Sequence, residues 1–278
     1  MKKLFVFSAL ALVTSGSFAA PVTGGSSSAY VQVGQSNLQG IGEVGVAMPT
    51  AVGGTADTSK IVSFKSGPIA QTNALIATPG TASAHIVMNG NKISETWKSS
   101  VAYGTQVYSY RQISDPLPNF PQFGGEVIAK VSGAEVYFGE WAPRKTGVQP
   151  DNSTDLNLTH ANRTVFFAGE NPTTSMPTLV NAKYDVVGIK KFDPGAPNVS
   201  TGTLTANYGG GSGTLAGSIA GGAGTVNFAG TNIASNGSFQ NTSGLIKGQF
   251  YGAGAEALAG IYNNGISSSS VAFGGKKQ

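Results

Sequence analysis

The side chains best suited to metal ligation in this 278-residue sequence are two histidines, His85 and His160, and no cysteine accompanies them. A zinc site usually takes three or four protein ligands, so carboxylates would have to complete it here. Haem iron needs only one or two axial ligands, and a histidine nitrogen suits it. The pair therefore favours haem over zinc, with His85 and His160 as candidate iron ligands. A structural or surface role for each histidine is the alternative.

Aromatic residues gather in the sequence between the two histidines. Tyr103, Tyr108 and Tyr110 fall close together, and Phe120 and Phe123 follow. Such side chains can wall a flat apolar ligand, while nearby basic groups meet its carboxylates. An ordinary β core with tyrosines at its rim is the alternative. The candidate cofactor-binding residues are Tyr103, Tyr108, Tyr110, Arg111, Lys98 and Met88, with Arg163 as a further partner for carboxylates.

Catalytic motifs do not support an enzyme. Residues 40–45 match the Gly-x-Gly-x-x-Gly string of dinucleotide sites, but no strand–helix–strand unit surrounds them, so a turn-rich sheet edge is expected. The Gly-x-Ser-x-Gly signature of α/β-hydrolases is not present. Glu135 and Glu140 lie on one expected hairpin, where their odd spacing puts them on opposite faces. We therefore expect a binding protein without catalytic residues.

The first 19 residues have the features of a secretory signal peptide. Lys2 and Lys3 precede an apolar run over 4–13, and Ser17 and Ala19 supply the small residues that a signal peptidase accepts. The run is too short to span a bilayer. We expect cleavage near Ala19 and a secreted protein with no membrane anchor.

Composition favours an all-β fold. Only 11% of the residues are charged, 40% are hydrophobic, and 40 glycines provide many turns. The net charge of +4 comes without a lysine and arginine cluster, which makes nucleic acid a poor candidate partner.

Strand patterns divide the chain after the signal peptide into an N-terminal β-rich domain, 20–173, and a C-terminal domain, 174–278. In the first, 126–131 and 134–141 predict a hairpin, and 142–159 reads as a long polar loop. Further strands are expected at 29–33, 61–64, 85–88, 101–110 and 163–168. The second shows eight short candidate strands about ten residues apart, which predicts a small antiparallel barrel. They are 184–189, 202–208, 213–219, 225–229, 238–241, 245–251, 257–262 and 269–273.

The C-terminal strands carry a family resemblance. Residues 246–260, IKGQFYGAGAEALAG, and 271–275, VAFGG, resemble the last strands of the transferrin-binding protein B (TbpB) type β-barrel. Members of that family are usually surface lipoproteins, whereas this chain has no cysteine to lipidate. With its signal peptide, its domain order, the segment VYFGEW at 136–141 and its two histidines, the chain is similar to the hemophilins, a family of secreted haem carriers.

The hemophilin resemblance implies a particular function. It implies an N-terminal handle domain that binds haem b and an eight-stranded C-terminal barrel. It also implies export by a Slam-type outer-membrane translocon, delivery of haem to a TonB-dependent outer-membrane receptor, and haemoglobin as a source of haem. The leading hypothesis is therefore a secreted haemophore for iron acquisition. The alternative is a secreted, non-enzymatic protein of the same barrel family that binds a host protein or a receptor and no haem.

Overall fold

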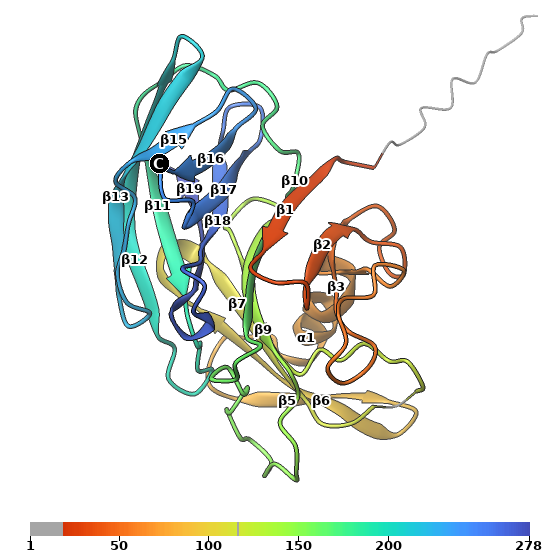
Figure 1. Ribbon diagram of the computed structural model, residues 1–278. Helices are drawn as coiled ribbons and strands as arrows, with labels where there is room; N and C mark the ends of the chain where they lie inside the picture. Colours follow the sequence, from red (N-terminus) through yellow and green to blue (C-terminus); the bar gives the residue numbers. More distant parts are fainter. Residues whose placement is uncertain (1–18, 116) are drawn as a thin grey trace, which may run out of the picture.

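The computed structural model describes residues 19–115 and 117–278, and nearly all of the regular structure in it is β (Figure 1). Most of the expected signal peptide, residues 1–18, lies outside the described residues. Within the described part of the chain, no helix is long and apolar enough to cross a membrane. The prediction of an all-β fold is confirmed.

The N-terminal half is built on an antiparallel sheet of seven strands. In spatial order these are β1 (Val22–Ser26), β10 (Thr164–Glu170), β9 (Val136–Ala142), β8 (Gly125–Lys130), β7 (Gln106–Gln112), β6 (Asn91–Ser100) and β5 (Ser83–Met88). The expected hairpin 126–131 and 134–141 is β8 and β9. A tight turn at Asn89 and Gly90, both with positive φ, joins β5 to β6.

A small layer covers one face of this sheet. It consists of β2 (Gln32–Gln35), β3 (Val44–Ala47), β4 (Val62–Ser63), the turn Lys65–Ile69 and the one-and-a-half-turn helix α1 (Ala70–Leu75). Val44, Val46 and Phe64 from this layer form one buried cluster with Tyr110 and Phe166 of the large sheet. The glycine-rich segment 40–45 is a turn over 40–43 followed by the first two residues of β3, as expected of a turn-rich sheet edge.

The C-terminal half closes into a barrel. Its strands are β11 (Leu179–Ile189), β12 (Val199–Gly209), β13 (Ser212–Gly221), β14 (Val226–Asn227), β15 (Thr231–Ile233), β16 (Ser238–Asn241), β17 (Ile246–Tyr251), β18 (Ala257–Tyr262) and β19 (Val271–Lys277). β14 pairs only with β13, and the other eight strands form a ring because β11 pairs with both β12 and β19 while β12 pairs with β13. The eight-stranded barrel is therefore confirmed.

One strand of the barrel differs from expectation. The segment 225–229 was expected to be a barrel strand, yet it supplies only the two-residue β14, and β15 takes the place in the ring. Gly224 and Gly230 both have positive φ, so the chain turns at each end of this segment.

The barrel packs against the face of the seven-stranded sheet opposite the small layer (Figure 1). Val107, Val127 and Phe138 of the sheet share one buried cluster with Val187 and Ala259 of the barrel. The sheet is therefore the middle of three layers, and a hydrophobic core crosses the expected domain boundary near residue 173.

A buried ion pair of the N-terminal half lies at this interface and bonds to the barrel. Arg163 and Glu140 are both fully buried, and the Arg163 Nε donates to a Glu140 carboxylate oxygen at 2.6 Å. The same guanidinium donates to the carbonyl oxygens of Ser267 and Ser270, in the loop before β19. Arg163, a sequence candidate for meeting ligand carboxylates, is thus occupied in joining the two halves.

Candidate ligand-binding site

The sheet distributes the predicted site residues over its two faces. Tyr108 and Tyr110 point toward the small layer, because their side chains belong to the cluster that includes Val44 and Phe64. Arg111, the next residue on β7, points to the opposite face, since side chains alternate along a strand. Lys98 pairs with Tyr108 across β6 and β7 and so shares the face of the tyrosines.

His85 lies on the edge strand β5, opposite Glu95 of β6. Its Nε2 atom is buried, lies 3.7 Å from an Asp151 carboxylate oxygen, and makes no hydrogen bond within the described chain. Tyr103 is 45% exposed in the turn Ala102–Gly104 between β6 and β7. Neither residue lines the two cavities described next.

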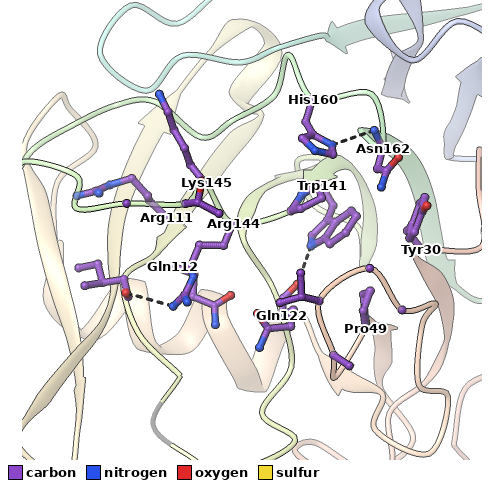
Figure 2. A pocket seen from close by; sticks show the side chains of 18 of the residues that line it. Tyr30, Pro49, Arg111, Gln112, Gln122, Trp141, Arg144, Lys145, His160 and Asn162 are labelled. Atoms are coloured by element: carbon purple, nitrogen blue, oxygen red, sulfur yellow. Dashed lines mark hydrogen bonds between the residues drawn. The ribbon is translucent and has the colours of Figure 1, made fainter.

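The larger cavity, about 660 Å³, lies at one end of the sheet and is here called the His160 cavity (Figure 2). Its wall is assembled from the loop 49–54, the ends of β7 and β9, the loop 143–149 and the turn at 160–162. The side chains that can bind a ligand through charge, aromatic contact or metal ligation are Tyr30, Arg111, Trp141, Arg144, Lys145 and His160.

The aromatic wall of the His160 cavity is fixed by packing. Trp141 is almost fully buried and its indole N–H donates to the Gln122 carbonyl oxygen at 2.9 Å. The ring of Tyr30 stacks on Trp141 with centroids 5.9 Å apart. Figure 2 shows His160 beside this pair, with the basic side chains across the cavity.

Positive charge dominates the lining of the His160 cavity, which includes no aspartate or glutamate. Each basic group nevertheless has a carboxylate nearby. Arg111 pairs with buried Glu95, and Lys145 pairs with Asp155. The Arg144 Nη2 atom lies 3.4 Å from an Asp115 carboxylate oxygen. The hydrogen bond from Lys145 lowers the pKa of Asp155. The buried Nε of Arg111 makes no hydrogen bond in the described chain, so this guanidinium keeps donor capacity.

His160 is exposed, and its Nδ1 accepts a hydrogen bond from the backbone N–H of Asn162 at 3.0 Å (Figure 2). Because Nδ1 is the acceptor, the neutral ring carries its proton on Nε2. Ligation of a metal through Nε2 would move that proton to Nδ1 and break the contact with Asn162. The exposed side chain has room to turn.

The His160 cavity contains residues that the sequence did not single out. Arg144 and Lys145 lie in the segment expected only to be a long polar loop, and Tyr30 and Trp141 were counted as strand residues. A signal for this cavity was present in the sequence. Two adjacent basic residues, Arg144 and Lys145, lie in a proline-bounded loop that ends at His160.

A second cavity, about 350 Å³, lies between the large sheet and the small layer and is here called the Glu126 cavity. Two predicted site residues, Met88 and Tyr110, line it together with Val46, Met48 and Glu126. Tyr110 is buried, and loss of solvent raises the pKa of its hydroxyl well above the ordinary value. The structure therefore brings Met88 and Tyr110 together in one cavity and places Arg111 and His160 around the other.

Glu126 predicts a pH dependence of stability. Burial raises the pKa of its carboxyl from 4.5 to about 8. Between these values the folded protein keeps a proton that the unfolded chain releases, so the free energy of unfolding falls as pH rises through this window. We expect Glu126→Gln to stabilise the protein by about 3–4 kcal/mol more at pH 8 than at pH 5, measured by urea unfolding.

Glu135→Gln is the control for this measurement. Although burial opposes the shift, hydrogen bonds from Lys130 and Tyr137 lower the pKa of Glu135, so its carboxylate favours folding at neutral pH. This variant should lose stability at pH 8. An equal effect of Glu126→Gln at both pH values would contradict the prediction.

No protein-family model matches the chain. Among solved structures, the isotype 1 transferrin binding protein B of serogroup B Neisseria meningitidis is 12% identical at a TM-score of 0.32, covering 70% of this chain and 52% of that one. A mutant of the Haemophilus parasuis protein is 17% identical at 0.25, covering 68% and 38%. A surface lipoprotein is 13% identical at 0.28, covering 67% and 99%. The chain thus spans about half or less of the length of these TbpB structures.

Proposed function

We propose that this chain is a secreted haemophore that binds one haem in the His160 cavity. The observation that carries the proposal is the grouping of a histidine, three basic side chains and two stacked aromatic rings around one cavity of about 660 Å³. This size lies within the range of pockets that bury small-molecule ligands. Haem is the cargo of such a protein, and no bond is made or broken in the porphyrin.

The chemistry of the cavity suits the parts of haem. The face of the macrocycle is apolar and would pack on Tyr30 and Trp141. Its two propionates are anionic and would meet the basic side chains of Arg111, Arg144 and Lys145. The imidazole of His160 is a suitable axial ligand once its ring has turned away from Asn162.

The Glu126 cavity suits haem less well. It is about half the size of the His160 cavity, and Lys60 is the only basic residue in its lining. That lysine is already paired with Asp57, so the described lining has no free cation to meet the propionates. Met88 and Tyr110, which were expected to bind the cofactor, belong to this cavity.

The remaining parts of the proposal follow from the resemblance in the sequence. They are cleavage near Ala19, export through a Slam-type outer-membrane translocon, transfer of haem to a TonB-dependent outer-membrane receptor, and uptake of haem from haemoglobin. Deleting residues 1–19 should retain the protein in producing cells, whereas the full chain should appear in the culture supernatant.

A hemin titration tests the central claim. We expect the purified protein from residue 20 onward to bind hemin in a ratio near one to one, with a saturable change in the Soret band. Serum albumin loaded at a known ratio and a protein without a haem site are the positive and negative controls. A titration that follows the negative control would contradict haem binding.

The second candidate function is capture of a host or receptor protein, and two exposed apolar side chains favour it. Val52 and Val148 are 89% and 99% exposed on loops that line the His160 cavity. Exposed apolar groups beside a cavity are typical of interaction surfaces. Stable binding to globin without haem, lost in the Val52→Ser/Val148→Ser variant, together with a negative hemin titration, would support this function instead.

A further inference from the structure

The Glu126 cavity has an apolar wall and one buried polar group without a partner. Val46 and Met48 come from the small layer, and Met88 and Tyr110 come from the large sheet. Glu126 is 3% exposed, and its Oε1 atom makes no hydrogen bond within the described residues. A buried carboxyl oxygen without a donor lowers stability, so its presence needs an explanation.

The polar neighbours of Glu126 have other partners. The Ser94 hydroxyl donates to the backbone oxygen of Glu95 at 3.0 Å. The Tyr110 hydroxyl accepts from Thr72 at 3.1 Å, on the side of α1. Lys60, in the lining of the cavity, pairs with Asp57 at 3.0 Å. Gln39 and Gln71 also line the cavity, but Glu126 Oε1 is the fully buried side-chain acceptor of the lining that has no partner among the described residues.

We propose that the Glu126 cavity binds a small apolar molecule that carries one O–H or N–H donor, and that Glu126 Oε1 accepts the hydrogen bond. The apolar wall would bury the body of the ligand, and the hydrogen bond to Glu126 would orient it. An anionic ligand is excluded from this class because Lys60, the one basic residue of the described lining, is already paired with Asp57. Burial of the Glu126 side chain raises its pKa to about 8, so the carboxyl is mostly neutral at pH 7.

The site is separate from the one proposed for haem. No described residue lines both cavities. The linings come closest in the sequence at two places, where Met48 and Pro121 of the Glu126 cavity are followed by Pro49 and Gln122 of the His160 cavity. Binding in the Glu126 cavity therefore does not depend on the haem proposal.

Equilibrium dialysis with 2-naphthol and naphthalene tests the inference, because the two probes differ by one hydroxyl. We expect the wild-type protein to bind 2-naphthol about tenfold more tightly than naphthalene. In Glu126→Met, which replaces the carboxyl by an apolar group of similar length, the two probes should bind equally. Glu126→Gln keeps a carbonyl acceptor and should keep the preference.

Two further variants locate the binding. Met88→Trp fills part of the cavity and should abolish binding of both probes, whereas His160→Ala should change neither. Circular dichroism of each variant checks that it is folded. The inference is overturned if the wild-type protein binds neither probe saturably, or if Glu126→Met keeps the tenfold preference.

Discussion

Replacing His160 by alanine is expected to weaken hemin binding about a hundredfold, whereas replacing His85 by alanine is expected to leave it unchanged. His160 lines the cavity that also holds Arg144 and Lys145, so removing its imidazole removes the proposed iron ligand. His85 is a matched control because its ring lies on edge strand β5 beside Asp151, outside both cavities.

Affinity alone would not separate loss of a ligand from loss of packing, so the spectrum is measured as well. We expect His160→Ala to change the Soret band and the spin state, and added imidazole to restore both. His85→Ala should retain the wild-type spectrum. A wild-type spectrum in His160→Ala together with a changed one in His85→Ala would assign the iron to His85 instead. Unchanged spectra in the double variant would exclude histidine ligation.

Much of the barrel could be predicted because its strands have one face in the core and one in water. Leu204, Ala206 and Tyr208 of β12 are buried, while Thr205 and Asn207 between them are not, which is the period-two pattern that sequence reveals. The exception is β15, which has only three residues, too few to show the period-two pattern.

Less of the N-terminal sheet could be predicted from the sequence, because the small layer covers one of its faces and the barrel covers the other. β6, missed in the sequence, has the polar string Asn-Lys-Ile-Ser-Glu-Thr-Trp-Lys-Ser-Ser. Glu95 is buried there because Arg111 pairs with it, and Thr96 because it bonds to Thr72. The expected strand 101–110 instead begins with the turn Ala102–Gly104, and only its second part belongs to β7. These polar residues can be buried because they bond to partners that are distant in the chain, and the local sequence pattern does not reveal those partners.

The sequence predicted which types of residue form the candidate site, but it predicted only in part which of them lie around the same cavity. His160 and Arg111 were selected for the chemistry that the His160 cavity suits, and Met88 and Tyr110 do share a cavity. The loops that bring Arg144 and Lys145 beside His160 have no periodicity, so their meeting depends on where β7 and β9 end.

Replacing Arg163 by methionine is expected to lower the free energy of unfolding by about 3–5 kcal/mol, because Glu140 would remain buried without a charged partner and keep only its bonds from two backbone N–H groups. The variant also leaves the carbonyl oxygens of Ser267 and Ser270 without their donor at the barrel interface. Guanidinium chloride unfolding, followed by tryptophan fluorescence and by far-ultraviolet circular dichroism, measures the loss.

Lys130→Met is the matched control, since the Lys130–Glu135 pair is partly exposed and should contribute less than about 1 kcal/mol. Both tryptophans, Trp97 and Trp141, lie in the N-terminal half, whereas circular dichroism reports on both halves. The shared core predicts coincident transitions for the two signals in the wild-type protein. A loss below 1 kcal/mol in Arg163→Met would contradict the role of the ion pair. Separate transitions in the wild-type protein would show that the halves unfold independently despite the core that they share.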